Sequence, residues 1–282
     1  MIVENIKKNS PQKNLQPQPT TQSNHLLEVN NLSIQFGGLK AVDQVTFHIG
    51  QSELLGLIGP NGAGKTTVFN IISGFYNCDS GEILFNSKNI NTLSAAEVNQ
   101  VGMARTFQNI RLFKNLTVIE NVLMALQQKK HQGSLSDWFN SLLNTKAHQV
   151  IEKNLYAEAL ELLKIFDLDR FAEEQADALS YGAQRKLEIV RALATKPQLL
   201  MLDEPAAGMN HQETAELNQL IRFIKEKFKL TILLIEHDMK LVMNICDRIV
   251  VLNRGRKIAD GLPQDIKCMP EVIEAYLGKK PV

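Results

Sequence analysis

Residues 54–66 read LLGLIGPNGAGKT, a continuous apolar run followed by a glycine-rich turn and a lysine–threonine pair. The run Leu54–Ile58 has the length and composition of a strand that is buried on both faces. Apolar side chains recur at helical spacing after the turn, at Val68, Phe69, Ile71, Ile72 and Phe75. A buried strand, a glycine turn and a helix in this order predict the first unit of a parallel α/β fold.

The turn itself fits the pattern G-x-x-x-x-G-K-[ST], which is typical of a loop that binds phosphate. Glycines let the backbone fold tightly, so that successive N–H groups point at phosphate oxygens, and the following helix adds its positive N-terminus. We expect Lys65 to bridge the β- and γ-phosphates of ATP and Thr66 to offer its hydroxyl to Mg²⁺. The expected nucleotide-binding residues of this loop are Gly59, Pro60, Asn61, Gly62, Ala63, Gly64, Lys65, Thr66 and Thr67.

A second apolar run, residues 199–202, ends directly at Asp203 and Glu204. A strand that ends in a carboxylate delivers it to the C-terminal edge of a parallel sheet, where phosphate ligands bind. We therefore expect Asp203 to hold Mg²⁺ through water and Glu204 to polarise the attacking water. Two adjacent acids after a strand would otherwise be read as a solvated strand end, and the glycine-rich loop decides between the two interpretations.

The rest of the chain predicts a mixed α/β protein. Alternating residues predict strands near 27–29, 32–36 and 45–49, and apolar runs predict strands at 230–235 and 249–252. Residues 94–170 look mainly helical, and residues 211–229 form an amphipathic helix that begins with a capping box of Asn210 and Glu213. Residues 1–24 are rich in Asn, Gln and Pro, and we expect a disordered tail there.

Composition excludes several classes of protein. Lys plus Arg is 31 and Asp plus Glu is 30, so the formal net charge is +1, which argues against a surface built to grip nucleic acid. Three cysteines, far apart in the chain, favour a reducing compartment over a disulfide framework. No apolar run approaches the roughly 20 residues that a membrane-spanning helix needs, and we expect neither a membrane span nor a signal peptide.

Taken together, the motifs resemble the ATP-binding cassette (ABC) family. The resemblance covers about residues 26–278 and rests on motifs in a fixed order: Phe36, the Walker A loop at 59–66, Gln108 in RTFQN (105–109), LSYGAQR (179–185), Walker B at Asp203 and Glu204, AGMN (207–210), and His237 in IEHD (235–238). It implies a P-loop NTPase fold with a RecA-like parallel core, an antiparallel β subdomain and a helical subdomain. Residues 25–282 would form a single ABC ATP-binding domain, with the helical subdomain inserted at about 105–182.

The resemblance also implies a role for each matched residue. Phe36 would stack on the adenine, and Ser180 and Gly182 would face the γ-phosphate of ATP held by an opposite subunit. Gln108 and His237 would join Glu204 as catalytic residues, and Gln108 would join Thr66 and Asp203 at the metal ion. Tyr181 and Ala183 depart from the usual signature sequence, and Asn210 departs from the usual Asp.

The sequences around Tyr181 and Asn210 are similar to those of the ATP-binding subunits of branched-chain or neutral amino acid importers. The C-terminal sequence PEVIEAYLG (270–278) is similar to these subunits too. That similarity implies an ATP-hydrolysing importer subunit, peripheral on the cytoplasmic face of the inner membrane. A urea or short-amide importer is the first alternative. A soluble ABC ATPase working on DNA, ribosomes or cluster assembly is the second, and a non-hydrolysing binding module is the third.

The implied partners are a second ABC ATPase subunit, either a sister cassette or a second copy of this chain, and two transmembrane permease subunits. A solute-binding protein would act indirectly, and no nucleic acid is expected. Residues 108–122 would form the groove that receives a helix of the permease, with Phe113 and Leu116 as candidate contacts.

Overall fold

A computed structural model describes residues 25–130 and 146–277. The tail predicted for residues 1–24 lies outside the described residues. The polar stretch 127–150 predicts a loop and a helix, and its central part, residues 131–145 with Trp138, also lies outside them. The strands are β1 (His25–Phe36), β2 (Leu39–Gly50), β3 (Leu54–Ile58), β4 (Ser80–Phe85), β5 (Lys88–Asn89), β6 (Met103–Arg105), β7 (Leu199–Asp203), β8 (Thr231–Ile235), β9 (Arg248–Asn253) and β10 (Arg256–Gly261). The α-helices are α1 (Lys65–Ile72), α2 (Ala95–Gln100), α3 (Val118–Lys130), α5 (Lys146–Ile165), α6 (Tyr181–Ala194), α7 (His211–Phe228), α8 (Met239–Ile245), α9 (Pro263–Ile266) and α10 (Pro270–Leu277).

The central sheet has the strand order β10-β9-β3-β8-β7-β6. Its strands run parallel except for β10, which pairs with β9 in the antiparallel sense. Side chains alternate between its two faces, so Leu200 and Leu202 pack into one hydrophobic cluster and Leu199 and Met201 into another. This two-sided burial explains why the strands read as unbroken apolar runs.

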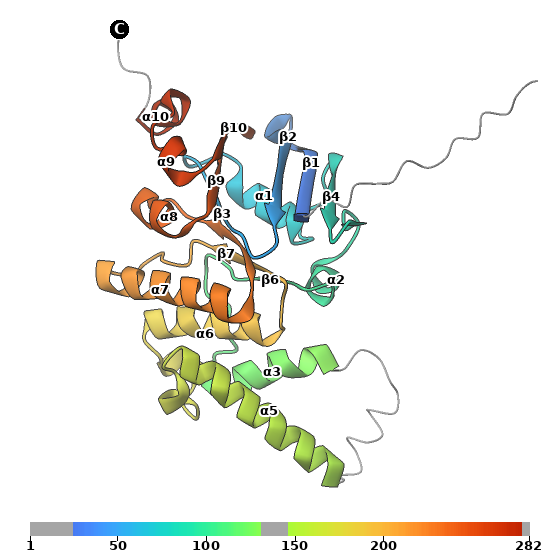
Figure 1. Ribbon diagram of the computed structural model, residues 1–282. Helices are drawn as coiled ribbons and strands as arrows, with labels where there is room; N and C mark the ends of the chain where they lie inside the picture. Colours follow the sequence, from blue (N-terminus) through green and yellow to red (C-terminus); the bar gives the residue numbers. More distant parts are fainter. Residues whose placement is uncertain (1–24, 131–145, 278–282) are drawn as a thin grey trace, which may run out of the picture.

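A second, antiparallel sheet of order β2-β1-β4-β5 lies beside the central one (Figure 1). Its strands β1 and β2 are longer than the alternating segments that predicted them. The α/β fold class with an antiparallel β layer, predicted from the sequence, is confirmed.

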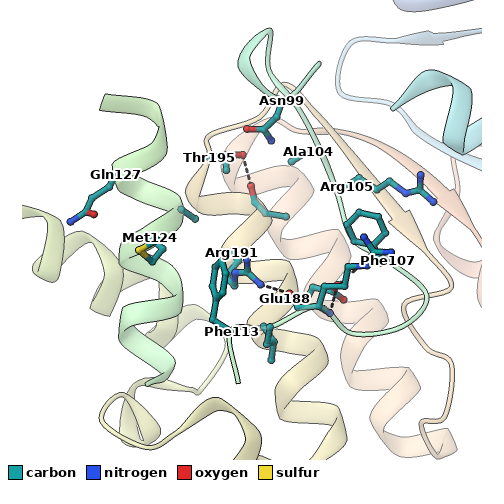
Figure 2. A pocket seen from close by; sticks show the side chains of 14 residues that line it. Asn99, Ala104, Arg105, Phe107, Phe113, Met124, Gln127, Glu188, Arg191 and Thr195 are labelled. Atoms are coloured by element: carbon teal, nitrogen blue, oxygen red, sulfur yellow. Dashed lines mark hydrogen bonds between the residues drawn. The ribbon is translucent and has the colours of Figure 1, made fainter. Parts of the chain in front are cut away.

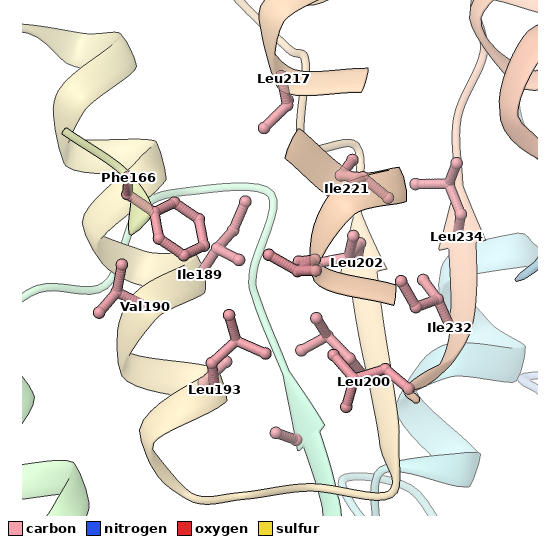
Figure 3. Packing of buried hydrophobic residues seen from close by; sticks show 14 of the residues in the cluster. Phe166, Ile189, Val190, Leu193, Leu200, Leu202, Leu217, Ile221, Ile232 and Leu234 are labelled. Atoms are coloured by element: carbon pink, nitrogen blue, oxygen red, sulfur yellow. The ribbon is translucent and has the colours of Figure 1, made fainter. Parts of the chain in front are cut away.

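Helices cover the central sheet, and Figure 3 shows α6 and α7 packing on β7 and β8 through Ile189, Leu193, Leu217, Ile221, Leu202 and Leu234. The capping box that begins α7 is confirmed, because the Asn210 side chain accepts from the N–H of Glu213 at 3.0 Å and Glu213 accepts from the N–H of Asn210 at 2.9 Å. The apolar stripe of α7 is buried at Leu217, Ile221 and Ile224, whereas Phe228 remains 38% exposed.

The segment 94–170 contains the helices α2, α3 and α5, but it departs from its mainly helical prediction between α2 and α3. Strand β6 interrupts it and pairs in parallel with β7, which extends the central sheet to its edge. Beyond β6, helices α3 and α5 lie away from β1 and β2, at the opposite end of the molecule (Figure 1). Helix α3 begins at a capping box, in which the Thr117 hydroxyl accepts from the N–H of Glu120 at 3.2 Å and Glu120 accepts from the N–H of Thr117 at 2.8 Å.

Gly56, in the middle of β3, allows helix α8 to pack closely on the central sheet. A Cβ at this position would lie 2.9 Å from Sγ of Cys246 and 3.0 Å from a methyl carbon of Val242. We expect Gly56→Ala to lower the free energy of unfolding by about 1–3 kcal/mol, because neither neighbour can move without repacking. Urea denaturation measures this loss.

Cys246→Ala provides the matched control, because it removes the sulfur that the new methyl group would meet. In a double-mutant cycle the pair should lose less free energy of unfolding than the sum of the two single substitutions. Additive losses would contradict the close packing of β3 against α8.

Candidate active site

The glycine-rich loop connects β3 to α1 and needs glycine at two positions. Gly59 has φ +153°, and a Cβ there would collide with the carbonyl oxygen of Leu252. Gly64 has φ +101°, and its Cβ would lie 2.6 Å from the carbonyl oxygen of Ala41. A side chain at either position would therefore push the loop away from the neighbouring backbone.

Lys65 is the first residue of α1 and lies almost completely buried inside the loop. Its ammonium group donates to the carbonyl oxygens of Gly59 at 2.8 Å and Pro60 at 3.1 Å. Burial lowers the pKa of Lys65, while Glu204 and Asp203 act in the opposite direction. The loop thus holds a buried cation whose only protein ligands described are neutral carbonyls, an arrangement that favours a negatively charged ligand.

A hollow of about 430 Å³ opens over this loop. Its lining includes Gly62, Ala63, Gly64, Lys65, Thr66 and Thr67 from the predicted set, together with Lys40 and Arg254. Phe36 does not line the hollow; its ring is 47% exposed and meets the edge of Tyr76 with 5.6 Å between ring centroids.

Asp203, the last residue of β7, is 3% exposed and forms an ion pair with Arg105 at 2.8 Å. Arg105 ends the neighbouring strand β6 and also donates to Asn70 and Ser73, both at 2.7 Å. The Thr106 hydroxyl accepts from the N–H of Asp203 at 3.4 Å. The carboxylate predicted to hold Mg²⁺ is therefore fixed in place by strand β6.

Glu204 begins the turn after β7 and adopts a left-handed backbone conformation, with φ +46°. Its N–H donates to the carbonyl of Ile235 at 3.0 Å. The side-chain amide of Gln108 donates to Glu204 Oε2 at 3.0 Å, and His237 Nδ1 lies 3.7 Å from the same oxygen. Three residues that are far apart in the sequence, Gln108, Glu204 and His237, thus meet at one carboxylate, as their predicted shared role requires.

Glu236 is a third acid at this edge, one that the sequence analysis did not single out. It is 1% exposed, and its Oε1 accepts from the N–H of Ala206 at 3.0 Å. Its Oε2 lies 3.9 Å from His237 Nδ1. Burial raises the pKa of Glu236. The side chain therefore connects the turn after β7 with the turn after β8.

Ser180 and Gly182 lie apart from the loop that holds Lys65. The Ser180 hydroxyl caps α6 by accepting from the N–H of Ala183 at 3.4 Å. Both residues line a different hollow, of about 410 Å³, together with Lys186, Met209 and Glu213. Tyr181 packs against Gly208, where an added Cβ would lie 3.1 Å from its ring. The LSYGAQR motif is thus in contact with the AGMN segment rather than with the phosphate loop of its own chain.

A third hollow, a groove of about 790 Å³, lies between α3, α6 and the segment that follows β6 (Figure 2). Phe113 and Met124 are about half exposed in its lining, and Arg191 lies over the Phe113 ring at 4.8 Å from its centroid. Leu116, a predicted contact, is not among the lining residues. Over residues 25–130 and 146–277, no helix combines the length and the hydropathy that crossing a membrane requires.

The geometry defines a nucleoside triphosphatase of the P-loop class, and comparison with known proteins places it further. The family model described as ABC transporter matches residues 42–207, and the model described as branched-chain amino acid ATP-binding cassette transporter matches residues 256–280. The chain is 47% identical over 257 residues to the high-affinity branched-chain amino acid transport ATP-binding protein LivG of Salmonella typhimurium, covering 91% of this chain and 99% of that protein.

Solved structures that resemble this chain are also ATP-binding cassettes. An ATP-binding cassette of an ABC transporter in its ADP conformation matches with a TM-score of 0.77 and 32% identity, covering 90% of this chain and 99% of the other. A dimeric ATP-binding cassette bound to ADP and Pi matches with a TM-score of 0.70 and 25% identity, covering 84% and 98%. The chain belongs to the family of ABC transporter ATP-binding proteins. Proteins of this family bind and hydrolyse ATP, and the chain is accordingly an ATPase.

The buried Glu236 generates a prediction about pH and stability. Its raised pKa means that the folded chain binds a proton more tightly than the unfolded chain, so stability is lost as the pH rises between the unfolded and the folded pKa. Glu236→Gln removes this loss and keeps an oxygen for the N–H of Ala206. We expect the variant to melt a few degrees higher than wild type at pH 8, a gain of about 1 kcal/mol, and to lose this advantage near pH 4.

Thermal melting at both pH values measures the effect, with Glu226→Gln on the exposed face of α7 as the control. The control should change the melting temperature little at either pH. A Glu236→Gln variant that melts below wild type at pH 8 would show that the carboxylate stabilises the fold.

Proposed function

We propose that the chain is the ATP-hydrolysing subunit of an importer of branched-chain or neutral amino acids. The match of residues 256–280 and the similarity to LivG support this substrate class. The observation that carries the hydrolytic part is the meeting of Gln108 and His237 at the Glu204 carboxylate, beside the buried Lys65.

In this mechanism Lys65 moves its ammonium group from the loop carbonyls to the β- and γ-phosphates. Glu204 takes a proton from the attacking water, whose oxygen bonds to the γ-phosphorus as the bond to the bridging oxygen breaks and ADP leaves with that oxygen. Gln108 and His237 orient Glu204 and the water. Mg²⁺, which we assign to Thr66, Asp203 and Gln108, supplies charge neutralisation at the phosphates when bound.

The residues around the loop have the chemistry that is needed to hold Mg²⁺ and a polyphosphate. Thr66 is exposed at the loop, and Asp203, whose Oδ2 is paired with Arg105, ends β7, two strands away from β3, so hard oxygen ligands of the kind that Mg²⁺ prefers are present at this edge of the sheet. The side chains of Lys40 and Arg254 at the rim add positive charge near the polyphosphate. Phe36 would have to turn from Tyr76 to stack on the adenine.

Two cassettes are required in this proposal. Ser180 and Gly182 line a hollow separate from the phosphate loop, so they reach a γ-phosphate only when it is held by another subunit. ATP then joins the two cassettes, and loss of the γ-phosphate contacts lets them separate. The second cassette is a sister subunit or a second copy of this chain.

The groove of Figure 2 is the proposed seat for a helix of each transmembrane permease. It is lined by residues of α3, α6 and the segment that carries Gln108, so a helix bound there would contact Phe107 and Arg111, which lie on either side of Gln108 in the chain. The subunit would lie peripherally on the cytoplasmic face of the membrane, with a solute-binding protein acting on the other side. Neither nucleic acid nor a soluble ABC role is part of this proposal, and urea remains the competing cargo.

Uptake measurements in a strain lacking this chain test the proposal. Labelled leucine uptake should return with the wild-type chain and stay at background with Glu204→Gln, because the amide cannot act as a base toward water. We expect this variant to keep its affinity for ATP, since Lys65 and the loop are unchanged.

Glu226→Gln is the matched control and should restore leucine uptake fully. Rescue of urea uptake instead of leucine uptake would move the substrate to the alternative class. Full leucine uptake with Glu204→Gln would contradict the assignment of Glu204.

A further inference from the structure

Arg185, in the first turns of α6, is a completely buried arginine. One guanidinium nitrogen donates to the carbonyl of Phe107 at 2.5 Å, and the other donates to the carbonyl of Gln108 at 2.6 Å. The first nitrogen also donates to Glu188 at 2.8 Å, and the second lies 3.4 Å from the Tyr181 hydroxyl. The planar guanidinium group thus grips two successive carbonyls of the segment that carries Gln108.

Glu188, one turn further along α6, accepts hydrogen bonds from N–H groups of the same segment. Its Oε1 accepts from the N–H of Phe107 at 3.2 Å and from that of Arg111 at 3.3 Å. Arg191, a further turn along, donates to the carbonyl of Arg111. Figure 2 shows Glu188 and Arg191 beside Phe107 and Phe113, at the wall of the groove.

A buried ion pair is a poor means of adding stability. Removing two charges from water costs about as much as their attraction returns, and apolar residues of similar volume often stabilise a fold as well or better. The pair instead holds the backbone around Gln108 in one position, because its hydrogen bonds go to backbone groups of Phe107 and Gln108. The Gln108 side chain in turn donates to Glu204, and the helix that carries the pair begins at Ser180.

We propose that Arg185 and Glu188 form a positioning latch that fixes the backbone of residues 107–111 to helix α6, so that the Gln108 contact with Glu204 and the placement of Ser180 change together. Neither residue touches the reacting atoms; both act through Gln108. A displacement of the groove wall at Arg111 is passed through Glu188 and Arg185 to the start of α6. The effect on catalysis rests on the proposed role of Glu204, whereas the mechanical connection does not.

Hydrogen exchange on the full-length chain tests the connection without any activity. In Arg185→Met/Glu188→Leu, apolar side chains replace both charges, so the fold should persist. Within residues 105–113, we expect amide exchange at Phe107 and Arg111 to become about tenfold faster, because each of these N–H groups loses its hydrogen bond to Glu188, while β7 and β8 stay unchanged.

Arg248→Lys is the matched control, because Arg248 joins Glu53 and Asp260 in ion pairs at the other end of the central sheet strands. It should leave exchange in residues 105–113 unchanged even where it lowers the melting temperature. If the double variant does not fold, Arg185→Lys takes its place, since a lysine cannot span both carbonyls. Unchanged exchange in residues 105–113, or acceleration that is uniform along the chain, would overturn the latch.

Steady-state ATP hydrolysis by the complex that co-purifies with this chain tests the consequence. Arg185→Lys should lower kcat about tenfold and leave KM for ATP within about twofold, because the residue positions Gln108 and does not bind ATP. In a Gln108→Ala background the same substitution should lower kcat by less than about twofold, because the contact that it positions is already lost.

A tenfold loss in both backgrounds would show that Arg185 does not act through Gln108 and would overturn the proposal. Absence of hydrolysis by the wild-type complex would count against the proposed function instead, and the exchange measurements would still decide the latch.

Discussion

The site depends on three adjacent parallel strands, β3, β8 and β7, that end at the same edge of the central sheet. The pairing places Leu57 opposite Ile235 and Ile235 opposite Asp203, so the residues that follow these strands emerge side by side. The phosphate loop, the Glu236–His237 pair and the Asp203–Glu204 pair come from these ends. A slip of one residue in any strand would move the residues that follow it by about 3.3 Å along the strand and out of line with the other two strand ends.

Some site residues at this edge of the sheet are buried, and others are exposed to solvent. Lys65, Asp203 and Glu236 are buried and held by short hydrogen bonds or an ion pair. Gln108 and His237 reach the same carboxylate from exposed segments, and the His237 side chain is 61% exposed. Ser180 and Gly182 lie outside this edge altogether, in a hollow of their own. Lys65, Asp203 and Glu236 are thus enclosed by the fold of one chain, whereas Gln108 and His237 are exposed to solvent.

The sequence predicted the core strands from their continuous apolar runs, which are typical of strands buried on both faces. It predicted Lys65 from the glycine-rich pattern, and Asp203 and Glu204 from the apolar strand that ends at them. Strand β6 was missed because its three residues carry no period and follow a helical segment. Strands β4 and β5 were missed as well, because β5 has only two residues and β4 buries only Ile83 and Phe85 among its six. Phe228 fitted the apolar stripe of α7 but lies at its end, where the helix runs past the core.

The sequence also failed to predict which charged side chains are buried. Arg105, Arg185, Glu188 and Glu236 look like surface residues in the sequence, because only tertiary contacts supply the partners that make their burial tolerable. A signal existed for Arg185 and Glu188, since both interrupt the otherwise apolar face of α6 beside Leu187 and Ile189. Reading such interruptions as interior hydrogen-bonding positions requires knowing what lies opposite.

A crystal structure of the full-length chain with ADP tests the central claim most directly. The parallel strand ends predict that the Lys65 ammonium leaves the carbonyls of Gly59 and Pro60 and bonds the β-phosphate at about 3 Å, with Asp203 and Glu204 facing the same phosphate end. An ADP molecule whose phosphates lie elsewhere, with Lys65 still bonded to both carbonyls, would contradict it.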